Sequence, residues 1–90
     1  MNCTFVIPIF NVTNYRFRNL LFIIFRMLET KIPIIIMEQK SLCSYNYNFH
    51  PKIKHIIIDS NDDVIEKSKL INKSVSYINT ESLWINDADI

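Results

Sequence analysis

The sequence predicts an α/β fold, with about four mostly parallel strands and two main helices, in a single domain over residues 1–90. Three observations predict it. Short apolar runs alternate along the chain with longer segments of helical period. The apolar runs are continuous rather than alternating, which is typical of strands that a parallel sheet buries on both faces. A hydrophobic fraction of 49% with 21% charged residues is that of a globular chain, which can build one small core.

Two apolar runs, residues 4–10 and residues 32–37, predict the first two strands. The first run is rich in β-branched and aromatic side chains. Pro8 should lie near its carboxyl end, because proline has no N–H to donate to a ladder. The second run is apolar throughout, as expected of a strand buried on both faces. With a helix between them, the two strands would form a βαβ unit.

The segment between these runs predicts a helix over residues 15–29, with Thr13 or Asn14 as its N-cap. Its apolar residues recur at the spacing of a core-facing stripe, namely Phe17, Leu20, Leu21, Ile24, Phe25 and Leu28. Three more apolar residues widen this face: Phe22, Ile23 and Met27. A face of that width predicts that a further layer covers the helix.

Residues 53–59 and 82–86 predict the third and fourth strands, joined by a helix over residues 62–78. Residues 40–52 lack helical period and predict a loop, with Pro51 as its boundary. Ser60 and Asn61 offer caps for the second helix, and Asp62 and Asp63 suit its positive end. Its core-facing positions follow helical spacing: Val64, Ser68, Ile71, Val75 and Ile78.

Composition narrows the classes of function. A net charge of +1 gives no electrostatic reason to expect nucleic acid or an anionic membrane as a partner. Cys3 and Cys43 are too few for a disulfide framework or a zinc site, so a reducing, cytoplasmic setting is expected. The longest uncharged apolar run, residues 20–25, is far below the roughly twenty residues of a membrane span. The absence of glycine excludes Gly-rich phosphate loops.

Ligands of open α/β sheets bind at the carboxyl ends of the strands, so the polar residues there are candidates for a site. They are Asn11, Glu38 with Gln39, Asp59, and Asp87 with Asp89. Two carboxylates at i and i+2 can converge on one cation where a strand turns, and oxygen ligands suit Mg²⁺ or Mn²⁺. Asp-x-Asp alone is common in turns. Its position directly after the fourth strand makes Asp87 and Asp89 metal candidates.

An ordered set of motifs resembles the front half of the family 2 glycosyltransferases. Residues 5–11, with Ile-Pro before a polar turn, resemble the opening strand of that family. Residues 67–72 and 82–90 look like its helix with an Asn and the strand that leads into its metal-binding Asp-x-Asp motif. The pair Glu38-Gln39 is similar to a galactosyltransferase-like and polymerase-like branch. The resemblance covers essentially the whole chain and implies a partial, Rossmann-like GT-A fold.

The resemblance also implies the roles of individual residues. Asp87 and Asp89 would serve the ribose and, through Mn²⁺ or Mg²⁺, the diphosphate of a nucleotide-sugar, usually a UDP-sugar. The cation would neutralise the charge that develops on the departing nucleoside diphosphate. The other implied nucleotide-sugar contacts are Pro8, Phe10, Asn11, Glu38 and Asn72. Lys73 departs from the family pattern, which usually has Gly after this Asn.

Each assignment has a structural alternative. Glu38 is equally consistent with a solvated strand end, and Asn72 with a surface position on its helix. Asp59 is better explained as a cap of the helix that follows it. His50 and His55 have no metal-binding spacing and should be structural or solvated. Trp84 and the Phe-rich stripe should lie in the core.

The predicted function is therefore that of the donor-binding half of a metal-dependent glycosyltransferase. In the family the acceptor site and the catalytic base follow Asp-x-Asp, and this sequence stops one residue past it. We expect a truncated domain that is inactive alone and whose acceptor half a separate polypeptide could supply, and no catalytic residue can be assigned. The alternative is a small non-catalytic α/β module that binds a nucleotide or a partner protein.

Overall fold

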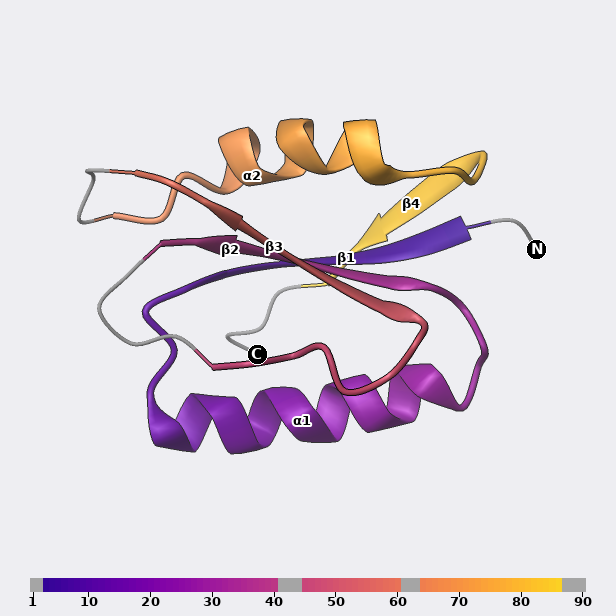
Figure 1. The fold of residues 1–90 in the computed structure, drawn as a ribbon, viewed down its shortest axis with the longest axis horizontal. Helices are drawn as coiled ribbons and strands as arrows, with labels where there is room; N and C mark the ends of the chain where they lie inside the picture. Colours follow the sequence, from indigo (N-terminus) through magenta and orange to yellow (C-terminus); the bar gives the residue numbers. More distant parts are fainter. Residues whose placement is uncertain (1–2, 41–44, 61–63, 87–90) are drawn as a thin grey trace.

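The computed structural model describes residues 3–40, 45–60 and 64–86, which form a four-stranded sheet with a helix on each face (Figure 1). In chain order the elements are β1 (Cys3–Phe10), α1 (Asn14–Leu28), β2 (Ile34–Gln39), β3 (Ile53–Ile58), α2 (Lys67–Ser74), the 3₁₀ turn η1 (Val75–Tyr77) and β4 (Ser82–Ile85). All three strand pairs are parallel, so the predicted α/β class is confirmed.

The strand order is β3-β2-β1-β4, which reverses the direction of the chain across the sheet. The chain first moves from β1 to β2 and β3, with α1 between β1 and β2 on one face (Figure 1). It then returns through α2 on the opposite face and adds β4 to the free side of β1 (Figure 1). This reversal creates a topological switch point between the carboxyl ends of β1 and β4.

α1 is an amphipathic helix that begins at the predicted cap. Thr13 Oγ1 accepts a hydrogen bond from the Arg16 amide at 3.4 Å. Leu20 and Ile24 are buried against the sheet. Phe25, which was predicted to face the core, is instead 55% exposed, and its ring lies 5.7 Å from that of Phe49. The prediction was wrong here because the buried stripe is narrower than the apolar pattern of the helix.

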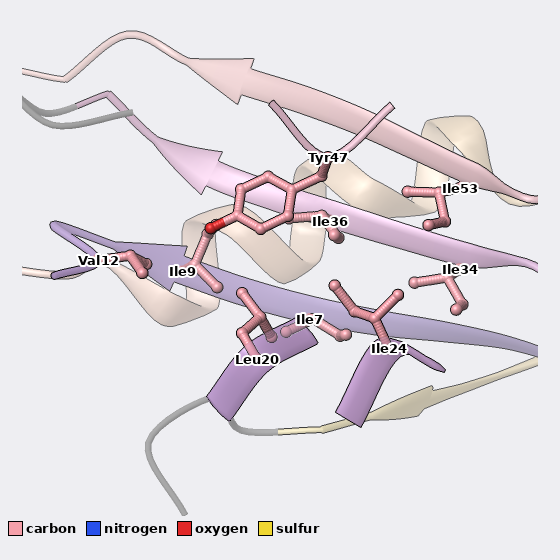
Figure 2. Close-up of a cluster of buried hydrophobic side chains, with 9 residues drawn as sticks. All are labelled: Ile7, Ile9, Val12, Leu20, Ile24, Ile34, Ile36, Tyr47 and Ile53. Carbon is pink, nitrogen blue, oxygen red and sulfur yellow. The ribbon is translucent and has the colours of Figure 1, made fainter. Parts of the chain in front are cut away.

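The core is unequal on the two faces of the sheet. Between α1 and the sheet, the buried cluster contains Ile7, Ile9, Val12, Leu20, Ile24, Ile34, Ile36, Tyr47 and Ile53 (Figure 2). Between α2 and the sheet, it contains Val6, Ile35, Met37 and Leu70. Tyr47 comes from the segment predicted as a loop, which has no helix or strand in its described residues, Lys40 and residues 45–52. The described part of that segment covers the α1 face without forming a helix between β2 and β3.

α2 is much shorter than the helix predicted over residues 62–78. Its N-cap is Glu66, so Asp59 does not cap it, and that prediction was wrong. The Asp59 side chain is 88% exposed and lies 3.4 Å from Lys40 Nζ. The predicted stripe was also misplaced, since Val64 and Val75 are 71% and 57% exposed. The buried residues of α2 are Leu70 and Ser74.

β4 is a short edge strand that leaves much of its apolar surface in contact with solvent. Trp84 is 48% exposed and lies against Phe5 with ring centroids 5.7 Å apart, so its predicted place in the core was wrong. The buried cluster under α1 contains residues of β1, β2 and β3 but none of β4, so Trp84 lies at the margin of that layer. No helix among the described residues is both long and apolar enough to cross a membrane.

Pro8 lies two residues before the carboxyl end of β1, as predicted, and in a central strand of the sheet. A proline is tolerated at this position because the ladder of hydrogen bonds between β1 and β4 does not use its backbone nitrogen. The Asn86 amide donates to Val6 O at 3.0 Å, so the backbone groups of Val6 face β4. Pro8, two residues later, faces the same side and has no N–H to continue the ladder. In the described residues, the pairing of β1 with β4 ends at this point.

Candidate functional site

The candidate site is the carboxyl edge of the sheet around the switch point. Asn11 follows β1 directly, is exposed and has a positive φ of 53°. An asparagine tolerates this left-handed conformation better than most residues do, so the chain can turn sharply away from the sheet. Asn86 follows β4 on the other side of the switch point. The metal candidates Asp87 and Asp89 lie outside the described residues, so their geometry stays a prediction.

The predicted nucleotide contacts come from different parts of the fold. Phe10 pairs with Gln39, and Ile9 with Glu38, so the ends of β1 and β2 lie side by side. Pro8 is buried and shares with Val6 the face that packs against α2. Asn72 is exposed on α2. The structure therefore brings Phe10 and Asn11 close to the end of β2, while Asn72 belongs to the α2 layer.

Glu38 is fully buried, and its environment is a cluster of polar side chains on the α1 face. Its Oε1 lies 2.7 Å from Nε2 of His55, whose side chain is 6% exposed. The Tyr47 ring meets the His55 ring edge-on, with centroids 5.0 Å apart. A ligand at the carboxyl edge of the sheet would reach Glu38 only after a rearrangement of this cluster. The nucleoside contact implied for Glu38 stays a prediction, and the solvated strand end proposed as its alternative was wrong.

The third member of this cluster, Tyr47, is a buried phenol. Its hydroxyl has no hydrogen-bond partner among the described residues. Burial, and then the charges of Glu38 and Tyr45, raise the pKa of Tyr47 well above its ordinary value of 10.0. Tyr47 is therefore neutral throughout the physiological range, and Glu38, His55 and Tyr47 form a closed polar cluster inside an apolar core.

The segment after Tyr47 holds His55 in place from the outer side of β3. The His55 amide donates to Asn48 Oδ1 at 3.3 Å, and the Ile53 amide donates to His50 O at 3.0 Å. His50 Nδ1 also accepts from the Lys52 amide at 3.1 Å. Both histidines are thus structural, as predicted. The one sequence signal for the buried cluster was a histidine inside the apolar strand that pairs with the strand of Glu38.

Gln39 fixes the start of the second half of the fold. Its Nε2 donates to Val64 O at 3.0 Å, and its Oε1 accepts from the Glu66 amide at 2.8 Å. Both ends of one amide are therefore used by the segment that leads into α2. This explains why the helix begins at residue 67, because residues 64–66 are held in a non-helical conformation along the end of β2.

The described residues contain no group of side chains that could serve as a metal-ligand set. Among them, no three His, Cys, Asp or Glu side chains are grouped so that they could hold a metal ion. An open hollow of about 520 Å³ lies at the amino ends of the strands instead, near Thr4, Lys54, Tyr77 and Thr80. That edge is opposite to the one predicted for the ligand.

Comparison with known proteins assigns no family to this chain. No protein-family model, no curated protein and no solved structure matches this chain.

Proposed function

We propose that this chain binds a nucleotide-sugar at the carboxyl ends of β1 and β4 and corresponds to the donor-binding half of a metal-dependent glycosyltransferase. One observation supports the proposal above all: the strand order reverses at β1. In open α/β sheets the crevice at such a reversal is where ligands bind. Asn11 follows β1 on one side of this reversal, and Asn86 follows β4 on the other.

The residues predicted for this edge suit the chemistry of a nucleoside diphosphate. Asp87 and Asp89 would hold Mn²⁺ or Mg²⁺ through carboxylate oxygens, which are the ligands that these cations prefer. The cation would supply charge neutralisation at the diphosphate. Phe10 and Asn11, at the end of the central strand, would contact the nucleoside. Asn72 lies on the α2 side and would have a secondary role.

Calorimetry with UDP-glucose and Mn²⁺ tests the proposal. We expect binding that requires the cation and that weakens at least tenfold in Asp87→Ala and in Asp89→Ala. Asp59→Ala is the matched control, because Asp59 also follows a strand at this edge but lies two strands from the switch point, and its side chain is exposed. Binding that the control weakens as much as the two variants do would contradict the proposed site.

A second candidate is a small non-catalytic α/β module, and the burial of Glu38 favours it. Glu38, one of the residues expected to contact the nucleoside, is hydrogen-bonded to His55 in the interior instead. The same titration separates the two candidates. Absence of UDP-glucose binding, or binding of UDP that is indifferent to Mn²⁺ and to both aspartate variants, supports the non-catalytic module.

A further inference from the structure

The two edges of the sheet differ in how their outward backbone groups are used. At the β3 edge, the segment that precedes the strand supplies partners: His50 O accepts from the Ile53 amide at 3.0 Å, and Asn48 Oδ1 accepts from the His55 amide at 3.3 Å. These are the residues of β3 whose backbone faces away from β2, since Lys52 O and Ile58 O accept bonds from the β2 side. The first two outward amides of β3, those of Ile53 and His55, are therefore satisfied by the chain's own preceding segment.

The β4 edge has no such cover among the described residues. The Asn86 amide points inward to Val6 O at 3.0 Å, so Trp84, two residues earlier, also faces β1. Leu83 and Ile85 consequently turn their N–H and C=O groups outward. Within residues 3–40, 45–60 and 64–86, no hydrogen bond reaches these outward groups. They form a row of two donors and two acceptors.

The side chains of β4 also lack the usual protection of an edge strand. Natural edges are commonly blocked by charged residues, by proline or by bulges. β4 reads Ser-Leu-Trp-Ile and has none of these, whereas β3 carries Lys54 in its second position. Trp84 and Ile85 are each 48% exposed and, as consecutive residues of a strand, point to opposite faces of the sheet. A strand added at this edge would thus gain apolar contacts on both faces.

We propose that β4 pairs antiparallel with β4 of a second copy of this chain, about a two-fold axis at Trp84. In this register Leu83 lies opposite the partner subunit's Ile85, and the two exchange both of their outward hydrogen bonds. The same holds for Ile85 and the partner subunit's Leu83. Trp84 then lies directly opposite its counterpart at a non-hydrogen-bonded position, where Cα atoms are about 4.5 Å apart and side chains pack closely.

A second copy fits this edge because the edge is self-complementary. One outward residue on each side of Trp84 matches every donor with an acceptor once the strand is rotated onto itself, which is the requirement of an isologous interface. A net charge of +1 leaves little repulsion between copies. Because stable interfaces bury roughly 800 Å² per partner, a four-residue strand supports a weak dimer that dissociates on dilution. This inference is independent of the proposed nucleotide site.

Sedimentation velocity over a range of concentrations tests the dimer. We expect the wild-type chain to shift reversibly from 10.7 kDa to twice that mass as the concentration rises. Ile85→Lys should require at least a tenfold higher concentration for the same shift. Ile57→Lys is the matched control at the β3 edge, since Ile57 is 50% exposed and Ile85 is 48% exposed. Circular dichroism of both variants establishes that they are folded.

Cross-linking tests the register and does not depend on the lysine variants. With Cys3 and Cys43 replaced by alanine, Trp84→Cys should form a disulfide-linked dimer under mild oxidation, because the two sulfur atoms face each other across the axis. Ile57→Cys should stay monomeric. A wild-type chain that remains a monomer at all concentrations overturns the proposal. So does equal weakening by the two lysine variants, or growth beyond a dimer, because two-fold pairing closes the assembly.

Discussion

The two faces of the sheet are built differently, although each is covered by one helix. The α1 face has a cluster of nine buried residues, to which the 45–52 segment adds Tyr47, and it encloses the contact between Glu38 and His55. The α2 face has a cluster of four buried hydrophobic residues and a two-turn helix that one glutamine side chain positions. The first face therefore carries most of the apolar burial, and the second serves mainly to return the chain to β4.

Because the faces differ, similar substitutions on them should lower the stability of the protein by different amounts. Ile24→Ala on the α1 face should cost about 4 kcal/mol of unfolding free energy, because Ile24 is completely enclosed and its loss leaves a cavity. Leu70→Ala on the α2 face should cost about 2 kcal/mol, because the thin layer around it can relax into the space. Urea unfolding of the two variants measures both values. Equal losses of unfolding free energy in the two variants would contradict this difference and show that the two faces are equally rigid.

The polar cluster allows a sharper test within the α1 face. His55→Ala removes the hydrogen bond to Glu38 Oε1 in a fully buried site, and the expected cost is about 3 kcal/mol. His50→Ala is the matched control, because His50 is exposed and its ring accepts only a local hydrogen bond, so it should cost less than 1 kcal/mol. If the two histidine variants were equally stable, the buried cluster would contribute nothing specific to the core.

The smallest expected effect is a gain in stability. Tyr47→Phe removes a buried hydroxyl that has no hydrogen-bond partner among the described residues. The variant should therefore be more stable by about 1 kcal/mol near neutral pH. The raised pKa of Tyr47 adds a dependence on pH. Above the ordinary value of 10.0 the unfolded tyrosine loses its proton while the folded one keeps it, so wild-type stability falls as the pH rises beyond that value.

Thermal melting at about pH 9 and about pH 11 measures this dependence. Tyr47→Phe should lose less stability between the two conditions than the wild type does. Tyr15→Phe, at a position that is 75% exposed, is the control and should follow the wild type. An alkaline loss of the same size in Tyr47→Phe would show that Tyr47 ionises freely and is not enclosed as described.

Strand and helix periodicity predicted the first half of the fold well. The continuous apolar runs identified β1, β2 and β3 to within about two residues, because burial on both faces of a parallel sheet demands such runs. The second helix was predicted too long. Its true start depends on Gln39, which holds residues 64–66 through contacts that are distant in sequence and that local pattern does not report.

The buried site was less predictable than the fold. Glu38 stood out as an acidic residue at the end of a strand, yet its partner, His55, is known only once β3 is placed beside β2. Tyr47 was missed for a similar reason, since an irregular segment has no periodicity that marks a core residue. Order and spacing can identify which residues are unusual, but pairing across strands decides whether they face a ligand or one another.

The strand order also sets when the protein can complete its fold during synthesis. β1 is the first strand of the chain and the partner of β4, and a hydrogen bond of 2.7 Å between the hydroxyls of Thr4 and Thr80 closes a separation of 76 residues. Until β4 emerges from the ribosome, one side of β1 has no strand to pair with. Contacts of such long range form slowly. A nascent chain of this protein therefore leaves one side of an early strand unpaired until a late strand arrives.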